Sequence, residues 1–238
     1  MVKTFEELDY HQTPLGDLAL RRKHIAMLGN LEVYEVMLGD AFLMSSLFHA
    51  VEEAVADLGL RELAGAECDV IVGGLGLGYT ALAALAHPNL RSLMVVEYLE
   101  PVIGWHQRGL VPLGATLAND QRCTFRQGDF FALAQSPAGF AEGRKFHAVL
   151  LDIDHSPCNL LDEQNAGFYS PAGLAAMAAH LHPGGVFAMW SDDPPDEEFL
   201  KALHAVFAPV RAEVVTFPNP LLDRDSASTV YVARKAAG

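Results

Sequence analysis

The chain has 238 residues, 51% of them hydrophobic, which is enough to bury a large core in one main domain with a small appendage. A formal net charge of −14 argues against a nucleic-acid or anionic-membrane partner, because both would be repelled, and is compatible with a cationic substrate. The three cysteines are scattered without metal-ligand spacing, which favours a reducing compartment and no bound metal. Glu6 and Glu7 stand where a signal peptide would be apolar, and no apolar run is long enough to span a bilayer, so we expect a cytoplasmic protein.

Residues 1–46 differ in pattern from the rest of the chain and predict a small antiparallel β-region. Segments 17–22 and 32–37 alternate apolar and polar residues, as half-exposed strands do, and the turn signal 28–30 lies between them. A third short strand is expected at 41–44. Because such a sheet is too small to be stable alone, it should pack on the main domain or on a second subunit.

Residues 47–238 alternate strands and helices, as α/β domains do. The first helix, 48–58, has apolar residues at helical spacing and Glu52, Glu53 and Asp57 on its expected solvent side. Later strands are expected at 69–72, 92–96, 123–127, 146–151, 186–190, 212–217 and 228–233. Later helices are expected at 80–86, 101–110, 171–180 and 197–207. The last two strands should form an antiparallel pair at the edge of the sheet.

Residues 69–80 are the centre of this pattern, because a β-branched apolar run breaks into four glycines and then into an alanine-rich helical run. Glycine is needed where a turn adopts positive φ and a ligand lies against bare backbone. We therefore expect Gly74, Gly76 and Gly78 to border a nucleotide-like ligand beyond the carboxyl end of the strand. The alternative is that these glycines serve only the tight packing of a strand on a helix.

An acid at the end of the next strand supports the ligand interpretation. Glu97 closes the run 92–96, where an acidic residue of a βαβ unit accepts hydrogen bonds from ribose hydroxyls. Its alternative role is that of a helix cap or a solvated surface acid. Together, the glycine turn and Glu97 favour an adenosine-containing ligand.

Five βα units followed by an antiparallel pair is the layout of adenosylmethionine-dependent transferases. Over nearly its whole length the chain resembles the polyamine aminopropyltransferases, the spermidine synthase family. The similar pieces are 72–74, 95–97 with 101–103, 128–130, 151–152, 168–169 and 182–185. The resemblance implies an α/β, Rossmann-like, seven-stranded sheet of the methyltransferase type, mostly parallel, with helices on both faces and the small β-region ahead of it. It also implies decarboxylated S-adenosylmethionine or S-adenosylmethionine as co-substrate, a small amine as acceptor, and a homodimer.

The resemblance also implies roles for residues at the ends of strands. Gln12 stands where the family has a ligand-facing glutamine. Asp129 would accept a hydrogen bond from the adenine amino group, and Phe130 would stack on the ring. Tyr169 and Asp192 would face the amine, although both are also typical of ordinary loop contacts.

Asp152 and Asp154 are the candidates for catalysis. Aminopropyl transfer is a displacement at the carbon beside a sulfonium, and an attacking amine with a pKa of about 10 arrives protonated at neutral pH. Asp152 matches the family's catalytic aspartate and would take this proton, while Asp154 would hold the amine or tune the first acid. His155 would relay a proton or serve only as a hydrogen-bonding loop residue.

Two departures from the family pattern affect the choice of co-substrate and acceptor. Gly76 replaces the aspartate that holds the amine of the decarboxylated co-substrate, and 44–46 replace a Tyr-His-Glu element near the acceptor. The second acid, Asp154, also stands at a different spacing from the family's.

Four functions therefore remain open from the sequence. The first is aminopropyl transfer to a small amine, and the second is methyl transfer with ordinary S-adenosylmethionine, which needs the same fold and tolerates Gly76 more readily. The third is a nicotinamide-dependent oxidoreductase, because 76–81 formally fit G-x-G-x-x-A. The fourth is a binding protein that has lost catalysis.

Overall fold

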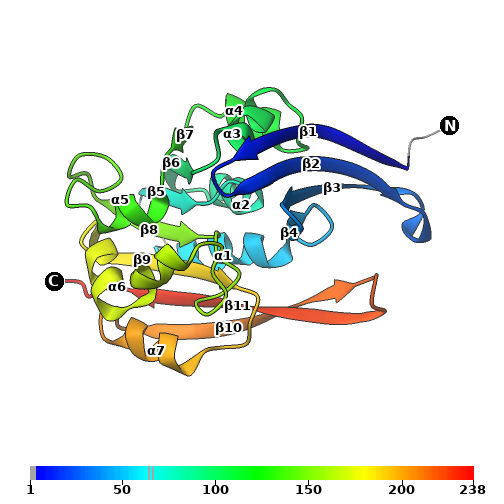
Figure 1. Cartoon of the computed structure of the whole chain (residues 1–238). Coiled ribbons are helices and arrows are strands. Elements are labelled where there is room, and N and C mark those ends of the chain that lie inside the picture. The colour runs from blue at the N-terminus through cyan, green and yellow to red at the C-terminus, as the bar shows by residue number, and fades with distance from the viewer. Residues whose placement is uncertain (1–3, 64, 66) are drawn as a thin grey trace.

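The computed structural model describes residues 4–63, 65 and 67–238 of the chain, so the first three positions of the expected β-region lie outside the described residues. Two sheets are joined by helix α1 (Ala50–Arg61). Figure 1 shows the N-terminal sheet beside the main domain, with the tip of a long C-terminal hairpin extending below it.

The N-terminal sheet contains four antiparallel strands within the described part of the chain, each paired with the next. They are β1 (Phe5–Thr13), β2 (Gly16–Ile25), β3 (Leu31–Leu38) and β4 (Ala41–Ser45). The sequence pattern misses β1, because its side chains alternate only between exposed and half-buried and show no apolar face. Asp9 of β1 accepts hydrogen bonds from Nε1 of Trp105, at 2.8 Å, and from Arg108, which ties this sheet to the main domain.

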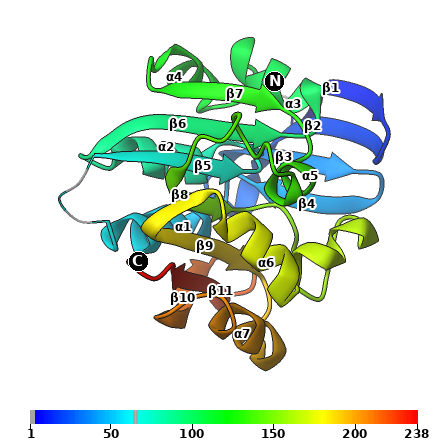
Figure 2. The ribbon, with the colours of Figure 1, turned by 90° about the vertical axis from the view of Figure 1, so that its left-hand side faces the viewer.

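The main sheet has seven strands in the residues that the structure describes, in the order β10-β11-β9-β8-β5-β6-β7. The strands are β5 (Cys68–Gly73), β6 (Leu90–Glu97), β7 (Cys123–Gln127), β8 (Phe146–Leu151), β9 (Leu181–Ser191), β10 (Val210–Asn219) and β11 (Arg224–Arg234). Strands β5 to β9 pair in parallel, whereas β11 is antiparallel to both of its neighbours. Figure 2 shows this order from β7 at the top to β10 at the bottom.

Helices cover both faces of the main sheet. Those that pack into the first buried cluster are α1, α2 (Tyr79–Ala86), α3 (Glu100–Gln107) and α4 (Gly114–Asn119). Those that pack into the second are α5 (Phe130–Gln135), α6 (Pro171–Ala178) and α7 (Glu197–His204), together with the 3-10 helix η2 (Glu163–Tyr169). The 3-10 helix η1 (Ala26–Leu28) fills the expected turn between β2 and β3. The sequence pattern misses α4, α5 and η2, because they are too short to show helical periodicity.

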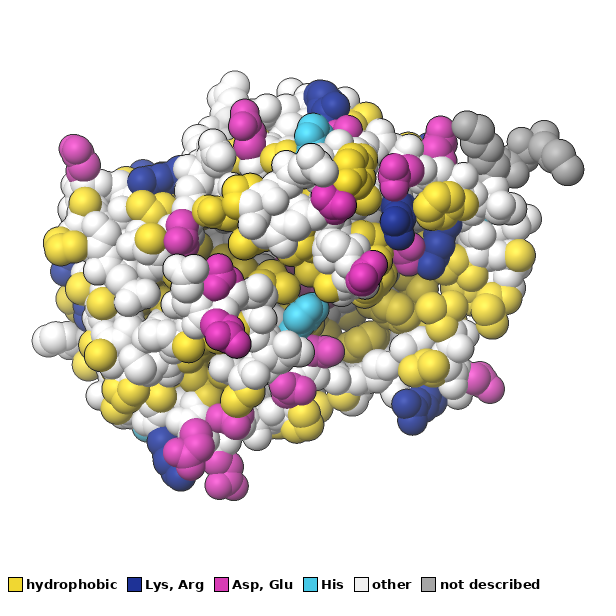
Figure 3. All heavy atoms as spheres, in the orientation of Figure 1, with side chains coloured by type: hydrophobic (Ala, Val, Ile, Leu, Met, Phe, Trp, Pro, Cys, Tyr) yellow, Lys and Arg dark blue, Asp and Glu magenta, His cyan; other side chains and the backbone are white. Residues whose placement is uncertain are grey.

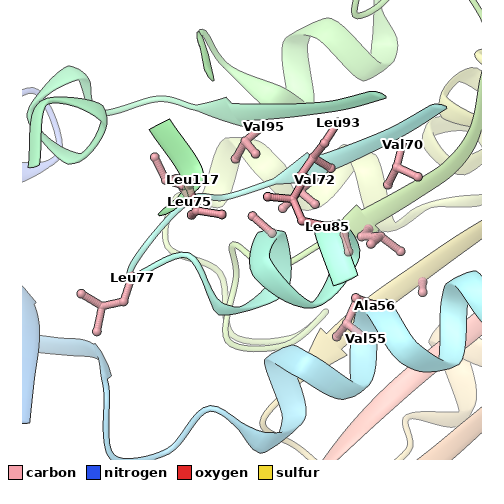
Figure 4. Close-up of a cluster of buried hydrophobic side chains, with 14 of the residues drawn as sticks. Val55, Ala56, Val70, Val72, Leu75, Leu77, Leu85, Leu93, Val95 and Leu117 are labelled. Carbon is pink, nitrogen blue, oxygen red and sulfur yellow. The ribbon is translucent and has the colours of Figure 1, made fainter. Parts of the chain in front are cut away.

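The two faces of the core follow from the period-two alternation of side chains along a strand. Val70 and Val72 of β5 point to the cluster that contains α1, whereas Ile71 points to the cluster that contains α6. Figure 4 shows the first cluster, in which Leu85 of α2 lies between the side chains of β5 and β6 and Val55 and Ala56 of α1. A strand buried on both faces is therefore apolar throughout, and its polar residues are confined to its ends.

The predicted α/β fold, with a mostly parallel seven-stranded sheet and a separate antiparallel N-terminal sheet, is confirmed. The sheet order brings the carboxyl ends of β5, β6, β8 and β9 to one edge, which faces the N-terminal sheet. No helix in the described residues is both long enough and apolar enough to cross a bilayer.

Candidate active site

A cavity of about 670 Å³ lies between the carboxyl edge of the main sheet, the N-terminal sheet and the β10–β11 hairpin. Its volume lies well within the range of small-molecule sites, roughly 300–1,000 Å³. Figure 3 shows the hollow on this face of the molecule, with acidic side chains beside it and hydrophobic side chains along its inner surface. The two kinds of side chain come from different elements.

The N-terminal sheet supplies an apolar wall. We define this wall as the six hydrophobic lining residues Leu15, Leu18, Val36, Leu38, Phe42 and Leu43. Besides these six, only Met44 and Ser45 of the described residues 4–45 line the cavity. This part of the chain therefore contributes no charged group to it.

The glycine turn after β5 is shaped by close contacts within the protein. Gly74, Gly76 and Gly78 have φ of +93°, +46° and +95°, a region that disfavours residues with a Cβ. A Cβ at Gly74 would meet the carbonyl oxygen of Asp152, and one at Gly76 would meet the sulfur of Met44. The turn is thus needed for tight packing, as one reading of the sequence predicted, while Gly74 and Gly76 also line the cavity.

Two side chains fix this turn. Nε2 of the buried His106 donates to the carbonyl oxygen of Gly76 at 2.9 Å, and the amide of Leu77 donates to the sulfur of Met44 at 3.2 Å. Burial lowers the pKa of His106, so the ring is held neutral. Met44 therefore fills the space beside Gly76.

Glu97 lies at the end of β6 beneath the glycine turn. Its Oε2 accepts from the amide of Leu75 at 3.0 Å, and its Oε1 accepts from the amide of Leu99 at 2.8 Å. Burial raises the pKa of this carboxyl, while the amide hydrogen bonds act in the opposite direction. Each oxygen keeps lone-pair capacity for a further donor, and the side chain lines the cavity.

Asp152 follows β8 and is oriented by α2. The hydroxyl of Thr80 donates to Oδ2 of Asp152 at 2.7 Å. Burial raises the pKa of Asp152 to about 6, although the Thr80 hydrogen bond lowers it. A carboxyl with this pKa is largely ionised at neutral pH and is still basic enough to accept a proton.

Three carboxyl groups form an acidic cluster in the lining: Glu52, Asp152 and Asp192. Burial, followed by the charge of Asp152, raises the pKa of Glu52 to about 8, and Asp192 adds to this repulsion. Ser228 donates to Oδ1 of Asp192 at 3.2 Å. The expectation that Glu52 lies on the solvent side of its helix is corrected: the N-terminal sheet and the hairpin enclose the first turn of α1, where Glu52 becomes part of the cavity lining.

Asp154 has a different environment from Asp152, although both follow β8. Its Oδ1 accepts from the amide of Leu161 at 2.7 Å, and its Oδ2 accepts from the hydroxyl of Tyr169 at 2.7 Å. Asn165 donates to both oxygens, at 3.1 and 3.2 Å. Asp154 is 2% exposed, and neither it nor Tyr169 lines the cavity. These two predicted site residues therefore hold the loop after β8 together and are not part of the cavity lining.

The structure brings together seven of the twelve residues predicted from the sequence. Those that line the cavity are Gly74, Gly76, Glu97, Phe130, Asp152, His155 and Asp192. Those that lie outside its lining are Gln12, Gly78, Asp129, Asp154 and Tyr169. Asp129 caps α5, where its Oδ1 accepts from the amides of Phe131 and Ala132, at 2.8 and 3.1 Å, and Gln12 is exposed on β1. The roles of all these residues in binding or catalysis stay predictions.

Sequence reasoning missed Glu52, Thr80 and Met44. Thr80 and Glu52 lie in the first turns of helices that begin near the cavity, which is the one signal that could have pointed to them. Nothing in the local sequence indicates that Met44 contacts a turn more than thirty residues away.

No family model and no curated protein matches this sequence. Among solved structures, a spermidine synthase from Thermotoga maritima matches with a TM-score of 0.72 and 15% identity, over 98% of this chain and 74% of that chain. The chain has a spermidine synthase-like fold. A spermidine synthase in complex with the transition-state analogue AdoDATO also matches, with a TM-score of 0.71 and 15% identity, over 98% of this chain and 73% of that chain. At this identity the likeness concerns the fold.

Proposed function

We propose that the protein transfers an aminopropyl group from decarboxylated S-adenosylmethionine to the nitrogen of a small amine. The acidic cluster is the observation that carries this proposal. Arg224 is the only lysine or arginine among the described lining residues, and it lies on the β10–β11 hairpin. The elements that carry the acidic cluster therefore contribute no lysine or arginine to the described lining. A sulfonium, the primary amine of the donor and the ammonium of an acceptor would each supply that positive charge.

The co-substrate fits the residues present beneath the glycine turn. Glu97 would accept hydrogen bonds from ribose hydroxyls with the lone pairs that its two amide contacts leave free. The apolar lining residues Val96, Leu99, Val102 and Phe130 would contact the purine.

The chain's own acid would carry the proton in this reaction. The acceptor ammonium gives one proton to Asp152, and the freed lone pair forms a bond to the methylene carbon beside the sulfonium. The carbon–sulfur bond breaks with its electron pair moving to sulfur, which leaves neutral methylthioadenosine and a secondary ammonium. Thr80 would keep Asp152 aimed at the nitrogen during this exchange.

Product analysis tests the proposal. The protein is incubated with decarboxylated S-adenosylmethionine and a panel of primary amines, and nucleoside products are separated by mass. We expect methylthioadenosine to form in amounts equal to the aminopropylated amine. Binding of the donor with no release of methylthioadenosine from any amine would contradict the proposal and favour a binding protein without catalysis.

Methyl transfer is the second candidate, and Gly76 favours it. Because Met44 fills the space beside Gly76, the turn offers no acid to the amine of the decarboxylated donor. The acidic cluster argues the other way, since it would repel the carboxylate of ordinary S-adenosylmethionine. A tenfold preference in affinity for the carboxylated form, equal to about 1.4 kcal/mol, together with adenosylhomocysteine as product, would establish methyl transfer.

A further inference from the structure

The cavity joins the acidic cluster to a large surface with no charge. The six residues of the apolar wall come from β2, β3, β4 and the turn after β1. Two of them are unusually open for hydrophobic side chains, since Phe42 is 47% exposed and Leu15 is 36% exposed. Hydrophobic residues exposed together inside a concave site indicate a binding surface.

We infer that the acceptor is a primary monoamine with an apolar body, whose nitrogen lies at the acidic cluster and whose hydrocarbon part lies against the apolar wall. This inference rests on the proposed function for the transfer step, and it adds the chemical class of the acceptor.

Charge at the far side of the cavity favours a monoamine over a diamine. A second ammonium would need its own carboxylate away from the acidic cluster. Residues 4–45 provide none, and the hairpin provides Asp225 only beside Arg224. Arg224 and Asp225 are neighbours in the hairpin lining and their charges cancel, so this side of the cavity offers no net negative charge to hold a distal ammonium.

The cavity also favours a small molecule over a second protein chain as the occupant of this wall. The wall is continuous with the lining that contains Glu97 and Asp152, and the whole cavity has a volume of about 670 Å³. A hydrocarbon chain attached to the reacting nitrogen would reach the wall directly, whereas a protein surface would have to enter the same concave space.

The test uses two series of acceptors, linear monoamines and the diamines of the same chain length. Decarboxylated S-adenosylmethionine is the donor in both. We expect kcat/KM to rise about three- to fourfold for each methylene added from butylamine to octylamine, as burial of about 0.8 kcal/mol per methylene implies. We also expect each monoamine to exceed the diamine of the same length by at least tenfold. A flat series, or a preference for the diamines, would overturn the inference while leaving aminopropyl transfer itself established.

A binding measurement decides the inference independently of turnover. Dissociation constants of the same amines are measured by calorimetry in the presence of methylthioadenosine, and the same dependence on chain length is expected. If binding follows that series while no amine releases methylthioadenosine, the proposed function fails and the amine site stands. If no amine binds, or if affinity is independent of length, the inference fails.

A matched pair of variants locates the effect. Phe42→Ser removes an exposed ring from the apolar wall, whereas Leu31→Ser removes a side chain of similar exposure, 45%, from the same sheet outside the cavity. We expect Phe42→Ser to weaken octylamine binding about tenfold with little change for butylamine, and Leu31→Ser to change neither. If Phe42→Ser instead dissociates a dimer in sedimentation analysis and leaves octylamine binding unchanged, the wall is an interface between copies of this chain.

Discussion

The base of the cavity and its apolar wall are held in different ways. At the base, Glu97 is fixed by two backbone amides, and Asp152 is fixed by the Thr80 hydroxyl. In the wall, Phe42 and Leu15 are exposed, and their hydrocarbon side chains offer no group that forms a hydrogen bond. Directional hydrogen bonds position a group within tenths of an ångström, whereas an apolar surface accepts ligands of different shapes. The base is thus suited to chemistry and the wall to selecting an acceptor.

This difference predicts that substitutions in the two regions change different measured quantities. Changes at the base should alter the rate or the affinity for the donor with every acceptor. Changes in the wall should alter the dependence on the acceptor's hydrocarbon chain, as proposed for Phe42. The following substitutions test the base, from the largest expected effect to the smallest.

Asp152→Asn should lower kcat by about 10²–10⁴, because the amide cannot accept the proton of the acceptor ammonium. Affinity for methylthioadenosine should stay within about twofold, since the group acts on the nucleophile. Thr80→Val provides a milder comparison, as it keeps the carboxylate but removes the hydroxyl that orients it. Rates with several amines and calorimetric binding of methylthioadenosine check both variants. A full rate for Asp152→Asn would remove this acid from catalysis.

Glu97→Gln should weaken methylthioadenosine binding about 10- to 100-fold. In the wild-type protein both oxygens of Glu97 accept hydrogen bonds from backbone amides, whereas the NH₂ group of glutamine cannot accept one. The variant also loses the charged acceptor for the ribose hydroxyls. Calorimetry measures the affinity, and a thermal melt shows whether the fold is retained. Unchanged affinity in a folded variant would mean that Glu97 supports the turn without contacting the nucleoside.

The positions of Glu97 and Asp152 beside the cavity could be predicted from the sequence. A strand that is buried on both faces carries apolar residues along its length, so its polar residues lie at its ends. Glu97 and Asp152 each follow an apolar run, and the parallel order of β5, β6 and β8 brings those ends together. The same argument does not separate Asp152 from Asp154. The environment of Asp154 is set by Tyr169 and Asn165, which follow in a 3-10 helix that has no periodic signal.

The wall and Glu52 were not predictable from local patterns. Alternation in β2 and β3 shows which side chains share a face, but it does not show what that face meets. The helical pattern of apolar residues shows only which face of α1 packs on the core of the main domain. Glu52 lies outside that face, so the pattern predicts that it faces solvent. Only the folding of the N-terminal sheet over the carboxyl edge turns that side of α1 into part of a cavity.

Asp154→Asn tests whether the loop acid is structural. The carboxylate accepts from Leu161, Asn165 and Tyr169, so an amide in its place directs two N–H groups toward existing donors. We expect the free energy of unfolding to fall by about 1–3 kcal/mol, while kcat of the folded variant changes less than fivefold. Chemical denaturation and steady-state rates measure the two quantities. A drop in kcat as large as that of Asp152→Asn, without loss of stability, would assign Asp154 to the reaction.

Glu52→Gln should have the smallest effect on the rate and a distinct dependence on pH. Asp152, with a pKa of about 6, ionises before Glu52, with a pKa of about 8, so the rise of kcat/KM through pH 6 should be the same in both proteins. Above pH 8 the ionised Glu52 of the wild-type protein adds a further negative charge at the amine, and the KM for the acceptor should fall a further few-fold. The variant should lack that second step.

Stability gives an independent readout of the same group. The folded protein binds the Glu52 proton more tightly than the unfolded chain, since its pKa is raised from 4.5 to about 8. The free energy of unfolding of the wild-type protein should therefore fall as pH rises through this window, and Glu52→Gln should remove part of the fall, about 1–3 kcal/mol at pH 8. Asp57→Asn is the matched control, because Asp57 is an exposed acid of the same helix that does not line the cavity. Equal pH profiles for Glu52→Gln and the wild-type protein would show that folding does not raise the pKa of Glu52.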